Sequence, residues 1–133
     1  MIRNQPLRVD EILKLLGKKK FSRWDYKKHK ETARALVHQR ITELNTHYNF
    51  KISRVAIRDT KTRWGSCSKG GNLNFNYKIL FLPPHIADYI IVHELCHLKE
   101  FNHSVNFWSL VAEVAPNHKA IRRELKRTSA LYR

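Results

Sequence analysis

The sequence predicts an α+β fold, and three observations support this prediction. Residues 26–47 carry apolar side chains at helical spacing, which indicates a long helix with one apolar stripe. Residues 51–76 contain three short runs with β-branched or alternating apolar residues, separated by glycines and polar turns, and these favour strands. Residues 84–98 are apolar on nearly every side, as is typical of a buried helix. Together they predict a small, mainly antiparallel sheet of about three strands packed against both helices, with further helices at the C-terminus.

The chain of 133 residues is long enough for one hydrophobic core. We expect residues 1–20 to form an N-terminal arm and residues 21–133 to form a single domain. Within the arm, apolar residues at helical spacing predict a short helix over residues 8–16, which Gly17 can close in a left-handed conformation. These apolar residues are Val9, Ile12, Leu13 and Leu16.

The middle of the chain supplies the long helix and the strands. The stripe of the helix consists of Ala33, Val37, Ile41, Leu44 and Tyr48. The strand runs are residues 51–58, 63–68 and 72–76. We expect residues 59–62 to turn the first strand back onto the second, and the glycines at 70 and 71 to form the next turn. In the third run Leu73 and Phe75 alternate with Asn72, Asn74 and Asn76.

The C-terminal third predicts helices with clear ends. Pro83 and Pro84 suit the first turn of the buried helix, and Ser104 is a suitable N-cap for a helix that Pro116 stops. Asn117 can cap the last helix, whose inward-facing residues are expected to be Ala120, Ile121, Leu125 and Thr128. Its basic side chains are expected on the outer surface: Lys119, Arg122, Arg123, Lys126 and Arg127.

The composition is strongly basic, with 26 Lys and Arg against 11 Asp and Glu and a formal net charge of +15. Such a charge permits association with nucleic acid or another polyanion, or it reflects a generally basic surface. Because there is neither an apolar run of about 18 residues nor a signal-peptide core, we expect no membrane span and a soluble cytoplasmic protein. Cys67 and Cys96 are then expected to be reduced packing residues.

The buried helix carries the motif His93-Glu94-Leu95-Cys96-His97, and His103 follows. Histidines four residues apart stand one turn above the other on one helix face, so their imidazoles can bind one ion. With His103 as third ligand, a zinc ion keeps one position open for water and substrate. Glu94 can then reach that water as a general base. The pattern predicts a catalytic site with one zinc per chain.

The neighbouring residues carry a resemblance to a known family. The shared motifs are Arg63-Trp64-Gly65-Ser66-Cys67-Ser68, Gly71-Asn72-Leu73-Asn74-Phe75-Asn76, Leu82-Pro83-Pro84, Asp88-Tyr89, the zinc motif through Leu98, Asn102-His103-Ser104 and Phe107-Trp108. Over roughly residues 27–126 the chain resembles the YgjP-like zinc metallopeptidases and, more distantly, the SprT-like proteases. The resemblance implies a zincin-like fold, with His93, His97 and His103 as zinc ligands and Glu94 as catalytic acid/base. Glu100 stands where the metzincin pattern has glycine, which argues against that family.

The sequence therefore predicts a zinc-dependent hydrolase that cleaves peptides or proteins. Candidates for donating to the oxyanion are Tyr89, Tyr77, Asn76 and His85. Candidates for contacting the substrate are Asn74 and Arg63, and the asparagine-lined strand is a candidate edge for an extended peptide. Candidates for supporting the zinc ligands are Asp88, Glu100 and Asn102.

Two other functions stay open on the sequence. A zinc-dependent phosphoanhydride hydrolase would use basic residues to neutralise phosphate, namely Arg58, Lys61, Arg63 and Lys69. A basic nucleic-acid-binding module with a structural zinc is the second, although a closed structural site requires four protein ligands and only three are evident.

Overall fold

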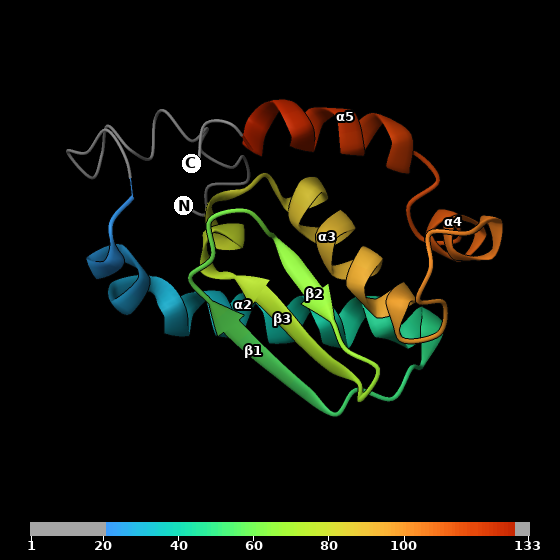
Figure 1. Ribbon diagram of the computed structural model, residues 1–133, viewed down its shortest axis with the longest axis horizontal. Helices are drawn as coiled ribbons and strands as arrows, with labels where there is room; N and C mark the ends of the chain where they lie inside the picture. Colours follow the sequence, from blue (N-terminus) through green and yellow to red (C-terminus); the bar gives the residue numbers. More distant parts are fainter. Residues whose placement is uncertain (1–20, 130–133) are drawn as a thin grey trace, which may run out of the picture.

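The computed structural model describes residues 21–129, so the predicted arm and the helix over residues 8–16 lie outside the described residues. The described elements follow in the order α2 (Arg23–Tyr48), β1 (Arg54–Arg58), β2 (Gly65–Cys67), β3 (Asn72–Asn76), the 3-10 helix η1 (Tyr77–Phe81), α3 (Pro84–His97), α4 (Val105–Ala112) and α5 (His118–Ser129). In Figure 1, α2 crosses behind the three strands, α3 lies next to β2, and α5 lies across α3 on the side away from the sheet. The α+β class is confirmed.

The sheet is mixed, with strand order β1-β3-β2. β2 pairs with β3 in the antiparallel sense, but β1 pairs with β3 in the parallel sense, with Val55 opposite Leu73. The predicted antiparallel pairing is therefore right for β2 and β3 and wrong for β1. The physical reason is that the connection after β1 does not form a hairpin; it carries the chain past one strand position to the edge, and β3 later fills the gap.

This strand order decides which edge of the sheet is free beside α3. β3 is central, and its main chain is paired on both sides, so the expectation that the asparagine-lined strand is an edge for an extended peptide is wrong. β2 is an edge strand instead, and it lies against α3.

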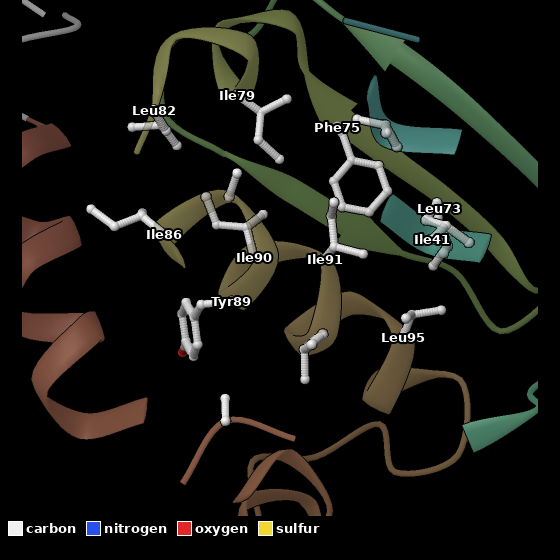
Figure 2. Close-up of a cluster of buried hydrophobic side chains, with 14 of the residues drawn as sticks. Ile41, Leu73, Phe75, Ile79, Leu82, Ile86, Tyr89, Ile90, Ile91 and Leu95 are labelled. Atoms are coloured by element: carbon white, nitrogen blue, oxygen red, sulfur yellow. The ribbon is translucent and has the colours of Figure 1, made fainter. Parts of the chain in front are cut away.

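The inner face of the sheet packs on α2 and α3 to form the core. Figure 2 shows Leu73 and Phe75 pointing from the sheet toward Ile41 of α2 and Ile91 of α3. Both sheet side chains are fully buried, and each such residue contributes about 1.5–3 kcal/mol through removal of apolar surface from water. Tyr89 projects from the opposite side of α3 (Figure 2), so the helix has one side in the core and one side toward α5.

Polar contacts hold α3 and α4 to the long helix α2. The guanidinium of Arg40 donates to both carboxylate oxygens of Asp88 on α3, each over 2.9 Å. The hydroxyl of Tyr48 donates to the carbonyl oxygen of Leu110 on α4 over 2.7 Å. Helix α3, which carries the histidine motif, and helix α4, which follows it, are thus both fixed to α2.

Within residues 21–129, every helix is too short or too polar to cross a bilayer.

Candidate active site

Three histidines meet at the end of α3. His93 and His97 lie one turn apart on that helix, and His103 comes from the loop before α4. One ring nitrogen from each residue lies within 4.8 Å of the others. The Nε2 atoms of His97 and His103 are 3.0 Å apart. The helical spacing and the short loop together bring three imidazoles to one point.

Hydrogen bonds set which ring nitrogens are available in this cluster. His97 Nδ1–H donates to the carbonyl oxygen of Glu100 over 3.0 Å, because a carbonyl can only accept. His93 Nδ1 lies 3.2 Å from Oε2 of Glu94, where it donates to the carboxylate. The Nε2 atoms of His93 and His97 are therefore the ones with a free lone pair, as a metal ligand requires.

The cluster fits a zinc ion. Two imidazole nitrogens on one tetrahedral zinc are about 3.3 Å apart, close to the separation of the His97 and His103 nitrogens. Burial lowers the pKa of His97, and burial together with the neighbouring His93 and His97 lowers the pKa of His103. Both shifts favour the neutral imidazole, which is the form that binds metal.

Aromatic rings on α4 pack around the imidazoles. Phe107 stacks on His97 with ring centroids 4.4 Å apart, and Trp108 stacks on His103 at 5.8 Å. Ser104 caps α4 by accepting a hydrogen bond from the main-chain N–H of Phe107, so the helix begins directly after His103. Phe107 and Trp108 therefore restrict the orientation of the His97 and His103 rings.

Glu94 is buried at 6% exposure and lies against Gly65 of the edge strand β2. A Cβ atom at position 65 would stand 3.0 Å from Cγ and 3.1 Å from Oε2 of Glu94. Almost any side chain there would displace the carboxylate. Sequence reasoning left the role of Gly65 open, since the helix that needs this space follows much later in the chain.

A cavity of about 320 Å³ opens beside Glu94 and His93. Its other lining residues are Trp64, Gly65, Tyr89, Ile90, Arg122, Leu125, Lys126 and Ser129. The indole Nε1–H of Trp64 donates to Ser129 Oγ over 2.8 Å, which joins β2 to α5 at the wall of this cavity.

Arg122 was expected on the outer surface of the last helix, and its side chain is indeed exposed. Its guanidinium lies over the ring of Trp108, 4.5 Å from the centroid, and lines the cavity beside His93. The helical pattern placed Ile121 and Leu125 inward correctly, but the same expectation is wrong for Ala120, which is exposed. The pattern also did not show that the polar side of α5 reaches the cavity beside α3.

The predicted oxyanion donors separate into one that reaches the cavity and three that do not. Tyr89 lines the cavity, and burial raises its pKa to about 12, so its hydroxyl stays a donor near neutral pH. Tyr77 is fully buried among Tyr26, Phe21 and Phe81 and does not line this cavity.

Asn76 and His85 are engaged elsewhere. Asn76 Nδ2 donates to main-chain oxygens of the loop before β2, and His85 Nε2 lies 2.8 Å from Oε1 of Glu124 on α5. The substrate-contact candidates also lie off the first cavity. Asn74 Nδ2 donates to Ser66 Oγ over 3.2 Å, and Arg63 lines a second cavity.

Of the three candidates for supporting the zinc ligands, only one contacts a histidine of the cluster. Glu100 supports His97, but through its main-chain carbonyl rather than its carboxylate. Asp88 is occupied by Arg40, and Asn102 is exposed. Cys96 is fully buried outside the histidine cluster, as its position on the helix predicts.

A comparison with protein-family models identifies residues 10–128 as a YgjP-like metallopeptidase domain. The chain belongs to the YgjP-like metallopeptidase family. Members of such a family work with a metal, and the histidine cluster of this YgjP-like domain is where the described residues could hold one.

Two solved structures resemble this YgjP-like chain. One is the metallopeptidase zymogen abylysin of Pyrococcus abyssi, with 28% identity and a TM-score of 0.61 over 68% of this chain and 93% of that chain. The other is the metallopeptidase zymogen jannalysin of Methanocaldococcus jannaschii, with 25% identity and a TM-score of 0.56 over 71% and 94%. Comparison with curated proteins gives no significant match.

Proposed function

We propose that this protein is a zinc-dependent peptidase in which His93, His97 and His103 hold one zinc and Glu94 is the general base. The observation that supports this most strongly is the meeting of three imidazole nitrogens within 4.8 Å, with the buried Glu94 beside one of them. Three protein ligands leave one position open, as a catalytic zinc requires. The family and both solved structures point to the same class of reaction.

Zinc bound there supplies a Lewis acid that polarises the scissile carbonyl and makes water more acidic. Glu94 takes the proton from the attacking water and passes it to the leaving amine. His93 Nδ1–H holds Oε2 of Glu94 at 3.2 Å and so helps to orient the carboxylate. Tyr89 donates its hydroxyl proton in a hydrogen bond to the oxyanion that forms at the carbonyl.

The edge strand β2 offers a place for an extended substrate. Asn76 N–H donates to the carbonyl oxygen of Trp64, and Ser68 N–H donates to that of Asn72. By the antiparallel pattern, Gly65 and Cys67 then direct their main-chain groups away from β3. A peptide can pair with these groups as an added strand beside Glu94.

The test is the change Glu94→Gln, which removes the proton acceptor but keeps the size of the side chain. We expect peptide cleavage to fall by about 10²-fold or more while one zinc per chain is retained. The matched control is Glu100→Gln, because Glu100 acts through its main-chain carbonyl and should keep full activity. Peptidase activity that survives Glu94→Gln would refute the proposed role.

The zinc ligands require their own measurement. Each of His93→Ala, His97→Ala and His103→Ala should lose zinc, because a three-ligand site has no replacement for a missing imidazole. Undiminished zinc in any one variant, measured by metal analysis, would remove that residue from the ligand set.

The net charge of +15 supports a second, separate proposal of salt-sensitive association with polyanions such as DNA in the cytoplasm. Titration with duplex and single-stranded DNA at rising salt tests it. Absence of binding at low salt would exclude it.

A further inference from the structure

A second cavity of about 280 Å³ lies beside the first, and the proposed mechanism does not use it. We call it the arginine cavity; it is lined by Arg58, Thr60, Arg63, Gly65, Ser66, Asn74, Phe75 and Asn76. Gly65 lines both cavities. The arginine cavity therefore begins at the residue that touches Glu94, and a group bound there would lie next to the reacting part of a substrate.

The charge of the arginine cavity is entirely positive. Two guanidinium groups line it and no carboxylate does. In the part of the chain that the structure describes, neither Arg58 nor Arg63 forms an ion pair. A guanidinium presents a fork of N–H donors that matches carboxylate and phosphate oxygens, so two of them in one cavity favour an anionic group.

Hydrogen bonds hold the wall of this cavity in place. Asn76, at 5% exposure, donates through Nδ2 to the carbonyl oxygens of Thr60 at 2.7 Å and Arg63 at 3.2 Å. Thr60 Oγ1 donates to the same carbonyl of Arg63 over 2.7 Å. A buried amide therefore fixes the loop that carries one of the arginines, which reduces the entropy lost when an anion is bound.

Polar side chains complete the lining on the strands. Asn74 Nδ2 donates to Ser66 Oγ over 3.2 Å, so the hydroxyl hydrogen of Ser66 is left to donate to another acceptor. Ser66 lies on β2, between the two residues that direct their main-chain groups outward. A substrate extended along β2 passes this hydroxyl.

We propose that the arginine cavity is an anion subsite that binds a carboxylate or phosphate group of the substrate close to the bond that is cut. In an extended peptide, successive side chains point to opposite faces. A residue whose carbonyl lies at Glu94 thus has a neighbour whose side chain is directed to the other face of the sheet. This inference rests on the proposed function, and it assigns a substrate class, anionic rather than neutral.

The test uses peptide pairs that differ only by Glu or Gln, with the exchanged position moved stepwise along the peptide. We expect one or two positions where the Glu peptide has a kcat/KM about tenfold or more above its Gln partner, since hydrogen bonds to charged groups are strong. Arg58→Gln combined with Arg63→Gln should abolish this preference. Arg54→Gln is the matched control, because Arg54 lies on the same strand but outside the cavity, and it should keep the preference.

A second arm separates carboxylate from phosphate as the source of the anion. Inorganic pyrophosphate and a nucleoside triphosphate are titrated into the Glu94→Gln protein, in competition with the Glu peptide. If the phosphate compounds bind more tightly than the peptide, and the double arginine change weakens them about tenfold or more while Arg54→Gln does not, the subsite takes phosphate. If the Glu peptide is the tighter ligand, it takes carboxylate.

The outcomes also distinguish this inference from the proposed function. Cleavage of Glu and Gln peptides at equal rates at every position, with no arginine-dependent anion binding, overturns the subsite and leaves the peptidase in place. Failure of the zinc-loaded protein to cleave any peptide overturns the peptidase, while binding to the Glu94→Gln protein still decides whether the arginines hold an anion. Equal losses in Arg54→Gln would show a general charge effect and also overturn the subsite.

Discussion

Gly65 shows how a single residue without a side chain can set the position of a carboxylate, here that of the proposed general base Glu94. Gly65 lies on β2 against α3, and Glu94 occupies the space that a methyl group would fill. The histidine motif gives the identity of the carboxylate, but its position depends on this distant strand. In the proposed mechanism, metal binding and the reactivity of the carboxylate would therefore depend on different residues.

We predict that Gly65→Ala lowers kcat by about tenfold or more and leaves zinc content unchanged. The added methyl group would stand 3.0 Å from Cγ of Glu94 and 3.1 Å from the Asn74 carbonyl oxygen, so the carboxylate must shift. The control is Gly70→Ala, whose methyl group would meet its nearest neighbours at 3.8 Å. Equal activity in the two variants would contradict the prediction.

Tyr89→Phe tests the proposed oxyanion donor. We expect kcat to fall by about 10²-fold with little change in KM, since the hydrogen bond forms with the transition state. Because burial raises the pKa of Tyr89 to about 12, the wild-type hydroxyl remains protonated and produces no alkaline decline until the pH nears that value. Tyr77→Phe is the control: its hydroxyl is buried away from the cavity, so kcat should not change.

At this scale the sequence was most informative where chemistry is local. His93, Glu94, His97 and His103 lie within one short stretch, so their spacing alone predicted the cluster that the structure brings together. The sequence could not identify Arg122 and Gly65 as site residues in the same way. Each reaches the cavity because of how two distant elements pack, and no local pattern encodes that packing.

At the scale of elements, α4 determines how His103 is held. The helix begins directly after this residue, and the Ser104 side chain accepts the main-chain N–H of Phe107 to close its first turn. Phe107 and Trp108 of that turn then pack on the imidazoles. The start of α4 is thus part of the proposed metal site.

Ser104→Ala should lower stability by about 1 kcal/mol, the usual cost of losing an N-cap. It should also weaken zinc binding in a chelator competition, because the first turn of α4 positions His103. Ser109→Ala is the control on the same helix, since Ser109 is exposed and caps nothing. Zinc affinity equal to that of Ser109→Ala would show that the cap does not support the ligand.

Helix ends and strand runs were largely predictable, whereas the order of the strands was not. Pro84 and Ser104 begin helices as expected, because capping depends on a few neighbouring residues. The parallel pairing of β1 with β3 depends on the path of residues 59–63, which the buried Asn76 holds. Turn residues alone favoured a hairpin, and a long-range contact prevailed over them.

At the scale of the whole molecule, three histidines connect stability to pH. Burial lowers the pKa of His97, His103 and His118 from the ordinary value of 6.5. The unfolded chain therefore binds protons at these positions more readily than the folded protein. Their contribution to the stability of the metal-free protein is complete above about pH 6.5 and is lost as the pH falls below it.

We predict that the metal-free protein has a smaller free energy of unfolding at about pH 5.5 than at about pH 7.5, as measured by urea denaturation. His118→Asn should reduce this difference, because it removes one buried titrating ring that lies outside the proposed ligand set. Greater stability at the lower pH would contradict the sign of these pKa shifts.

The three imidazoles all come from residues 93–103, whereas the position of the Glu94 carboxylate depends on β2, a strand far earlier in the chain. Closing so short a segment around an ion costs little chain entropy, so a partly unfolded molecule can keep its metal. If the proposed site is right, we expect that a preparation of this protein can be fully metallated and inactive. Zinc content would then measure the integrity of one short segment, and only turnover would measure whether the sheet has docked against it.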